Sequence, residues 1–342
     1  MSAGRTHFSL EEAAAVVSHY DVGVIHQTRR LSGGSRDVPK IVVITDQGKF
    51  LLKRRPKGKA NLHHVDFAHG VQGHLAEHDF PVTTLMATRE DNSTVFEWED
   101  SIYELFKFVT GSRYDGSAEA TVEAGRQLAG LHLDLTDFSG QGEPLKGSFH
   151  DALIVRRHLR AAGGRKAERP SRQLQHIAEV LMELYNASSV RVNELGFDSW
   201  AEQVVHGDWH PGNMLFRGRK LVAVLDFDSA RVAPRVTDLA NGMLQFSIVG
   251  GRPNPADWPA YLDEQKVTQF LDGYRDVIEP GEHELRAVLD LMIETMIAEA
   301  ILPVAATGFF GHLCGVEFLK MIRRKCEWII AHRESLAEAI GV

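Results

Sequence analysis

Polar residues that could do chemistry follow a short apolar run near the middle of the chain. Asp208 and Asn213 lie five residues apart, and Pro211 and Gly212 between them keep this stretch out of a helix. A carboxylate can accept a proton from a hydroxyl group, and an amide oxygen can bind a hard cation. The spacing of the two residues equals that of a phosphoryl-transfer loop, in which the Asp accepts a hydroxyl proton and the Asn binds Mg²⁺.

Two more carboxylates follow the next apolar run. Leu221–Leu225 has the composition of a buried strand, and Asp226 and Asp228 come directly after it. Mg²⁺ takes oxygen ligands, so these carboxylates together with Asn213 and the phosphates of a nucleotide make a plausible shell. Asp226 is the strongest ligand candidate by its place at the end of the strand.

The first part of the chain has the pattern of an antiparallel meander with one helix. Turn residues in 31–37 include Gly33, Gly34 and Ser35, and Lys53 is expected at the end of the third strand. Apolar residues at helical spacing predict a helix over 61–78. The predicted strands are 27–31, 40–45, 49–53, 93–98 and 102–108.

Long helical patterns dominate after residue 117, which places a boundary near 111–117 and two domains at 1–110 and 111–342. The predicted helices begin with the segment around 117–132 and continue over 151–162, 171–186, 282–301 and 316–339.

The motifs in this order resemble those of the aminoglycoside phosphotransferase and choline kinase family. His206–Asn213 is similar to its H-G-D-x-H-x-x-N hallmark, and Asp226-Phe227-Asp228 to its D-x-D segment. Gly125–His132 resembles its G-R-x-L-A-x-L-H helix, and Asp238-Leu239-Ala240 its D-L-A segment. The resemblance runs from about Tyr20 to Asn241, and its first strands look most like the homoserine kinase type II and spore-coat kinase-like branches.

This resemblance implies an α+β, two-lobed protein-kinase-like fold. It implies a nucleotide-binding lobe over 1–110, and a mainly helical lobe over 111–342 with the catalytic loop and the substrate pocket. The implied reaction moves the γ-phosphate of ATP, with Mg²⁺, to a hydroxyl of a small molecule such as an amino alcohol, a homoserine-like compound, an aminoglycoside or a sugar. The implied site residues are Asp208 as the catalytic residue, Gly33, Gly34, Ser35, Lys53, Phe106 and Phe108 for the nucleotide, and Asn213, Asp226 and Asp228 for the metal.

One expected residue has no counterpart in the pattern. Kinases of this shape pair the strand lysine with a glutamate on the following helix, but the apolar face around Ala68 offers no acid. Asp66 and Glu77 lie off that face, so the acidic partner of Lys53 stays open. The missing acid is also the best support for the alternative of a non-catalytic, kinase-fold ATP-binding protein.

Composition favours a small partner in a reducing compartment. The chain has 342 residues and a formal charge of −8, which disfavours general binding to nucleic acid or to an anionic membrane. Its two cysteines cannot form a disulfide framework, and no stretch is apolar enough for a membrane span. We expect a cytoplasmic protein.

Three other enzymatic interpretations are weaker. A metallohydrolase would need His206 and His210 on one continuous helix, which Gly207 and Pro211 oppose. His74–His78 spells the short H-x-x-E-H order of one zinc protease group, but a solvated helix face is the simpler interpretation. A protein kinase would carry D-F-G and A-P-E segments, which this sequence lacks.

Overall fold

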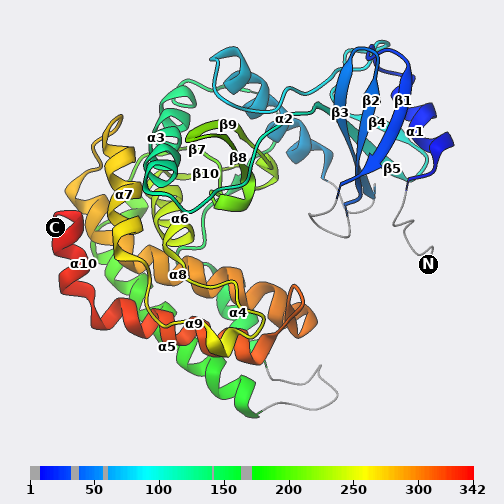
Figure 1. Ribbon diagram of the computed structural model, residues 1–342. Coiled ribbons are helices and arrows are strands. Elements are labelled where there is room, and N and C mark those ends of the chain that lie inside the picture. The colour runs from blue at the N-terminus through cyan, green and yellow to red at the C-terminus, as the bar shows by residue number, and fades with distance from the viewer. Residues whose placement is uncertain (1–7, 32–37, 57–60, 141, 163–171) are drawn as a thin grey trace. The chain divides into compact units, whose positions relative to one another are not determined.

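The computed structural model describes residues 8–31, 38–56, 61–140, 142–162 and 172–342 of the chain. Contacts between Cα atoms divide the chain into two units (Figure 1). The first comprises Met1–Ser112, Asp137–Pro144 and Met214–Ala230, and the second comprises Arg113–Thr136, Leu145–Asn213 and Arg231–Val342. The α+β class predicted from the sequence is confirmed.

A five-stranded antiparallel sheet forms the first unit, with strand order β1-β2-β3-β5-β4. Its core holds aliphatic and aromatic side chains, among them Val43, Leu52 and Leu105, which are fully buried. The elements of the sheet and its helices are α1 (Leu10–Val17), β1 (Ile25–Arg30), β2 (Lys40–Thr45), β3 (Gly48–Pro56), α2 (Leu62–Glu77), β4 (Phe96–Trp98) and β5 (Ser101–Lys107).

Strand β3 continues beyond Lys53, so the prediction of Lys53 at a strand end was wrong. Arg54 and Arg55 extend the strand because each finds an acid within the unit: Glu12 for Arg54 and Glu104 for Arg55. Consecutive basic residues are usually exposed and would be expected at the end of a strand. Here the acidic partners compensate the charges of Arg54 and Arg55, so both residues can stay within the sheet. The fourth predicted strand was also too long, since β4 begins only at Phe96.

A hairpin from later in the chain also belongs to the first unit. β8 (Met214–Arg217) pairs antiparallel with β9 (Lys220–Val224), and Val224 forms a bridge to Val82. The short 3₁₀ turn Phe227–Ser229 follows β9 and Asp226. The hairpin thus brings the two carboxylates after β9 into the unit that contains Lys53.

The second unit is mainly helical, with one small sheet of order β6-β10-β7. The long helix α8 is buried on all sides over much of its length, and α5 and α6 pack against it. Its elements are α3 (Ala118–Asp134), β6 (Leu145–Lys146), α4 (Leu153–Ala161), α5 (Arg172–Glu194), β7 (Glu202–Val205), β10 (Arg231–Pro234), α6 (Val236–Ser247), α7 (Glu264–Arg275), α8 (Glu282–Thr307), β11 (Phe309–Phe310), β12 (Leu313–Cys314), α9 (Gly315–Ala331) and α10 (Arg333–Ile340).

Two glycines allow α3 and α7 to pack closely. A Cβ atom at Gly125 would lie 2.0 Å from the carbonyl oxygen of Phe270, and one at Gly273 would lie 1.9 Å from that of Val122. Side-chain atoms do not approach backbone this closely, so each position needs glycine. This contact explains the glycine of the Gly125–His132 motif in physical terms.

No helix in the described part of the chain is both long and apolar enough to cross a membrane.

The helix predicted over 316–339 is in fact two helices, α9 and α10, which meet at His332. The backbone of His332 leaves the helical region there, at φ −109° and ψ 18°.

Candidate active site

The loop that carries Asp208 follows a buried strand of the second unit. β7 ends with the buried Val204 and Val205, and Gly207 then takes a left-handed conformation with φ 75°. The segment Pro211–Asn213 forms a single 3₁₀ turn. The chain therefore leaves the strand, turns sharply at a glycine and presents Asp208 from a loop, as Pro211 and Gly212 led us to expect.

Asp238 of α6 holds this loop in place. Its carboxylate accepts hydrogen bonds from the backbone N–H groups of His206 (2.6 Å) and Gly207 (2.9 Å). Asp238 is 1% exposed, and His132 Nε2 of α3 lies 3.6 Å from it. Burial opposes its ionisation, but His132 and the backbone donors outweigh this effect and lower the pKa of Asp238. Asp238 lies in the first turn of α6 but bonds the loop instead of its own helix.

Hydrogen bonds within the loop fix the Asp208 side chain. Asn213 Nδ2 donates to Asp208 Oδ2 (3.0 Å) and to its carbonyl oxygen (3.1 Å). His206 Nδ1 accepts from the Asp208 N–H (3.2 Å), and His210 Nε2 lies 3.5 Å from Asp208 Oδ2. Burial raises the pKa of Asp208, but His210, His206 and Asn213 outweigh it, so that the pKa is lowered. These contacts favour the ionised form of Asp208 and fix its carboxylate, while His206 braces its backbone N–H group.

The first unit brings Lys53, Asp226 and Asp228 together. Lys53 Nζ lies 3.0 Å from Asp228 Oδ2 and 3.9 Å from Asp226 Oδ1. Arg55 Nη2 also donates to Asp228, at 2.6 Å. Asp226 has φ 63° and ψ 68°, a left-handed backbone conformation that is strained for a non-glycine residue and is concentrated at functional sites.

The two carboxylates differ in how well the protein itself compensates their charge. Burial raises the pKa of Asp226, and the negative charge of Asp228 adds to the rise against the attraction of Lys53. Burial acts in the same direction on Asp228, but Arg55 and Lys53 prevail and lower its pKa. Asp226 is therefore the carboxylate that a divalent cation would stabilise most, and this donor chemistry fits Mg²⁺.

Asn213 also carries an oxygen donor of the kind that Mg²⁺ prefers. Its side-chain nitrogen makes both bonds to Asp208, so its carbonyl oxygen is the atom available to a hard cation. Asp208 and Asn213 belong to the second unit, whereas Lys53, Asp226 and Asp228 belong to the first.

The sequence did not reveal the residues that support Lys53. Glu104 of β5 lies 3.8 Å from Lys53 Nζ, and Arg55 bonds both Glu104 and Asp228. Glu104 is 1% exposed. One signal was available, because a charged residue interrupts the apolar run Ile102–Phe106. The pairing of β3 with β5, which places Glu104 opposite Lys53, was not part of the sequence pattern.

Only some of the residues predicted to bind the nucleotide lie in the part of the chain that the structure describes. Gly33, Gly34 and Ser35 lie outside the described residues. Phe106 is buried in β5 and Phe108 follows the strand. The backbone N–H groups of Lys107 and Phe108 already donate to the carbonyls of Thr84 (2.8 Å) and Lys49 (2.9 Å).

The histidines considered for zinc do not form a metal centre in the structure. His206 and His210 lie in the loop after β7, whereas the metallohydrolase motif needs a helix. The rings of His74 and His78, at the end of α2, are 4.3 Å apart. In the ranges that the structure describes, no three or more His, Cys, Asp or Glu residues are grouped to hold a metal ion.

Comparison with known proteins decides the family. A sequence profile of the phosphotransferase enzyme family matches residues 27–287, more than half of the chain. The chain belongs to this family. The prediction from the His206–Asn213 motif of a kinase that transfers a phosphoryl group to an alcohol group of a small molecule is thereby confirmed. Among curated proteins, no sequence matches the chain.

Solved structures of this phosphotransferase fold extend over nearly the whole chain. An amicoumacin kinase in complex with AMP-PNP, Ca²⁺ and Ami has a TM-score of 0.70 at 13% identity, covering 94% of this chain and 93% of the other. A microcompartment-associated aminopropanol kinase has a TM-score of 0.72 at 15% identity, covering 96% and 99%. An aminoglycoside phosphotransferase from Alicyclobacillus acidocaldarius has a TM-score of 0.65 at 19% identity, covering 96% of both chains.

Proposed function

We propose that this phosphotransferase moves the γ-phosphoryl group of ATP, with Mg²⁺, to a hydroxyl group of a small amine-bearing acceptor. The observation that carries the proposal is the carboxylate of Asp208, fixed by a hydrogen bond from Asn213 in a loop that Asp238 holds. Phosphoryl transfer requires mainly positioning and charge neutralisation, and these are what the residues of the two units supply. Glu104 also provides an acid for Lys53, which removes the main support for a non-catalytic ATP-binding protein.

In this proposal each residue has one role. Asp208 accepts a hydrogen bond from the acceptor hydroxyl, orients its oxygen for attack on the γ-phosphorus and takes up the proton as the new P–O bond forms and ADP leaves. Lys53 binds the phosphates by charge, and Gly33, Gly34 and Ser35 bind them by backbone N–H groups. The adenine edge meets the backbone around Phe106 and Phe108, through carbonyl groups or residues further on, because the Lys107 and Phe108 N–H groups are already bonded.

Asn213, Asp226 and Asp228 are the proposed ligands of Mg²⁺. When bound, the ion supplies positive charge that neutralises the phosphate oxygens. The negative charge of Asp226 is the less compensated of the two carboxylates, so Asp226 is the ligand that the ion would stabilise most. Lys53 and Arg55 bond Asp228 in the same unit. We assign nucleotide binding to the lobe at 1–110, and the catalytic loop and acceptor pocket to 111–342.

A polar stripe in the second unit is the proposed acceptor site. Asn241 and Gln245 lie on one face of α6, and Thr295 and Glu299 lie one turn apart on α8, which packs against α6. Gln245 Nε2 donates to Glu299 at 2.5 Å. The Asn241 Oδ1 atom is buried, and within the described ranges it has no hydrogen-bond partner.

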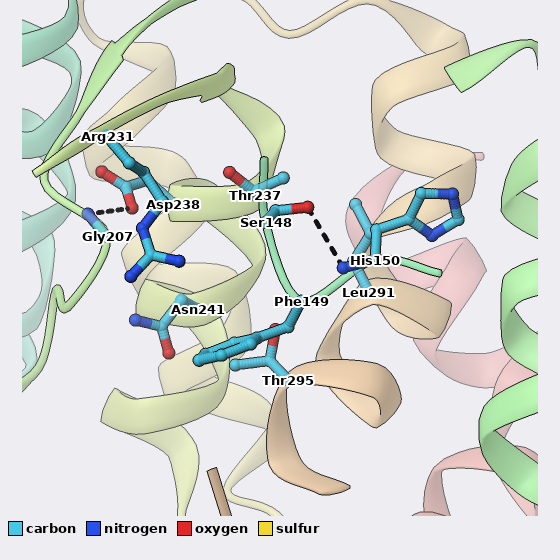
Figure 2. A pocket seen from close by; sticks show the side chains of 10 residues that line it. All are labelled: Ser148, Phe149, His150, Gly207, Arg231, Thr237, Asp238, Asn241, Leu291 and Thr295. Carbon is cyan, nitrogen blue, oxygen red and sulfur yellow. Dashed lines mark hydrogen bonds between the residues drawn. The ribbon is translucent and has the colours of Figure 1, made fainter. Parts of the chain in front are cut away.

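A small pocket opens onto this stripe beside the catalytic loop. Gly207, Arg231, Asn241 and Thr295 line it together with Phe149 (Figure 2). In Figure 2, Asn241 lies below the Arg231 guanidinium group, which stands over the Phe149 ring at 5.5 Å. An unbonded amide oxygen on α6 and a carboxylate on the neighbouring α8 suit a ligand with N–H donors, such as an ammonium group. The aminopropanol and aminoglycoside substrates in the names of two similar structures are amines of this kind.

The compartment proposed for this enzyme is the cytoplasm. Cys314 is exposed and Cys326 is buried, and both are free thiols. An exposed free thiol fits a reducing compartment.

The test is a screen of acceptor-dependent ADP release with MgATP. The panel comprises aminopropanol, ethanolamine, choline, homoserine, thiamine, aminoglycosides and amine-free sugars, with the D208N variant as the blank for each compound. We expect turnover with at least one amine-bearing alcohol, at a rate about 100-fold or more above that of the blank. Turnover confined to amine-free sugars would contradict the acceptor class, and ATP binding without turnover of any compound would contradict the enzymatic proposal.

A further inference from the structure

The structure assigns a positioning role to Glu104: we propose that this strand residue holds Lys53 for the nucleotide phosphates, where related kinases use an acid on the helix after β3. The inference rests on the proposed function, since it concerns how Lys53 meets the nucleotide. Glu104 itself touches neither nucleotide nor acceptor in this proposal, and it acts through Lys53.

The register of the sheet places the two side chains together. Lys53 of β3 and Glu104 of β5 are directly opposite in the antiparallel ladder, so both project from the same face of the sheet. Lys53 Nζ lies 3.8 Å from Glu104 Oε2, and the Lys53 side chain is itself 8% exposed. The position of Glu104 is therefore set by backbone hydrogen bonds of the sheet and does not depend on a helix orientation.

Further contacts fix the Glu104 carboxylate rigidly. His69 Nε2 lies 2.8 Å from Oε1, and Arg55 bonds both carboxylate oxygens. Thr94 Oγ1 holds the other ring nitrogen of His69 at 2.8 Å. Burial opposes ionisation of Glu104, but Lys53, His69 and Arg55 prevail and lower its pKa to about 2. These contacts favour the ionised form of Glu104 and hold its carboxylate beside Lys53.

The other acids near Lys53 have a different role in the proposed function. Asp228 and Asp226 lie within 4 Å of Lys53, at 3.0 and 3.9 Å, and both are proposed Mg²⁺ ligands. A divalent cation on these carboxylates would compete with Lys53 for their charge. Glu104 is enclosed beneath the lysine and belongs to no proposed metal site, so it is the acid that can keep Lys53 in place with or without a metal.

Helix α2 provides a histidine for the Lys53–Glu104 pair, where an acid was expected. His69 is a buried residue of α2, and it contacts the acid that the strand provides. The helix therefore supports the Lys53 pair through a hydrogen bond to Glu104. Lys53 therefore has an acidic partner although the apolar face of α2 around Ala68 carries no acid.

A double-mutant cycle tests the assignment without relying on turnover. The affinity of a fluorescent ATP analogue is measured in EDTA for wild type, K53M, E104Q and the double variant. We expect E104Q to weaken binding about tenfold in the wild-type background and to have little further effect once Lys53 is methionine, because Glu104 acts through the lysine.

Glu12→Gln is the matched control. Glu12 is also a buried acid, and it pairs with Arg54, the next residue of β3, at 2.5 Å and with Tyr103 Oη at 2.8 Å. Neighbouring strand residues point to opposite faces, so Glu12 is on the other side of the sheet from Lys53. Both E12Q and E104Q should lower the melting temperature, but only E104Q should change nucleotide affinity.

The outcomes separate the inference from the proposed function. Unchanged nucleotide affinity in folded E104Q, or an equal loss in both backgrounds, would overturn the role of Glu104 while leaving the function intact. If E104Q does not fold, H69Q is used in the same cycle, and a smaller loss confined to the Lys53 background is expected; no loss would overturn the role. A wild-type protein that binds no ATP analogue would overturn the function and this inference together.

Discussion

Asp208 works as one member of a short hydrogen-bonded loop. Its carboxylate bonds Asn213, and its backbone N–H bonds His206. These contacts could be expected from the residue types and spacing, because a carboxylate and an amide five residues apart across Pro211 and Gly212 can meet only in a tight turn. Glu104 could not be expected in the same way, since it meets Lys53 only through a strand pairing about fifty residues away in sequence.

Asp226 should dominate the response to metal. Mg²⁺ with ADP is expected to raise the melting temperature of the wild-type protein by several degrees, because a ligand that binds only the folded state stabilises it. D226N should lose most of this increment, and EDTA should abolish turnover of the wild type. Differential scanning fluorimetry with and without Mg²⁺ measures the effect.

The control for this metal test is D100N, which changes an exposed acid at the turn before β5. It should respond to Mg²⁺ as the wild type does. An undiminished Mg²⁺ increment in D226N would contradict the assignment of Asp226 as the principal ligand.

Glu299 should give the acceptor step a pH dependence near neutrality. Burial and the charge of Asp208 raise the pKa of Glu299 to about 7. A group with a raised pKa is protonated below that pH, so its attraction for an ammonium group is lost as pH falls through 7. We expect kcat/KM for the amine acceptor to fall toward pH 6, while KM for ATP stays nearly constant.

E299Q should lower acceptor kcat/KM about tenfold at pH 8 and remove this pH dependence, as expected for the loss of one charge-assisted contact. A wild-type profile that is flat from pH 6 to pH 8, or an E299Q profile that keeps the decline, would argue against Glu299 as the amine-binding group.

At the scale of the element, α6 connects the catalytic loop to the helical core. Asp238 is buried and accepts two backbone hydrogen bonds from the loop after β7. D238N should cost about 2 kcal/mol of unfolding free energy, because a charged acceptor of buried donors is lost. It should also lower kcat far more than it raises KM for ATP, since the loop carries Asp208. D272N, at an exposed position on α7, is the control and should change neither quantity.

The close contact of α3 and α7 makes another prediction at this scale. Gly125→Ala should destabilise the protein by about 1–3 kcal/mol, because the new Cβ atom meets the Phe270 carbonyl and the helices must separate. Gly73→Ala is the matched change within a helix, with open space around the new atom, and should stabilise by about 0.5–1 kcal/mol. Chemical denaturation measures both, and equal effects of the two substitutions would contradict the packing account.

Elements were predicted from the sequence where local patterns decide them. Residues 40–45 form β2 as expected, and α2 lies within the predicted 61–78. The predicted strand ends were wrong where contacts between distant residues determine the structure. Strand β3 continues through Arg54 and Arg55 because acids far away in the sequence compensate their charges. The separation of α9 from α10 at His332 has no glycine or proline to mark it, so periodicity alone merged the two helices.

At the scale of the whole molecule, sequence motifs were sufficient for the family and the fold class, because the residues that do chemistry are consecutive or nearly so. The grouping of chain segments was not evident from the sequence. Met214–Ala230 belongs with the first unit, although long helical segments of the second precede and follow it. The hairpin β8–β9 thereby places Asp226 beside Lys53, a proximity that neither motif alone contains.

The most direct test of this account is the initial rate of acceptor-dependent ADP release at saturating MgATP, compared between wild type and D208N. D208N should lose about 10²- to 10⁴-fold in kcat, the usual contribution of a positioned general base, while its KM for ATP and its melting temperature stay close to those of the wild type. A D208N variant that releases ADP at the wild-type rate would contradict the assignment of Asp208 and with it the proposed mechanism.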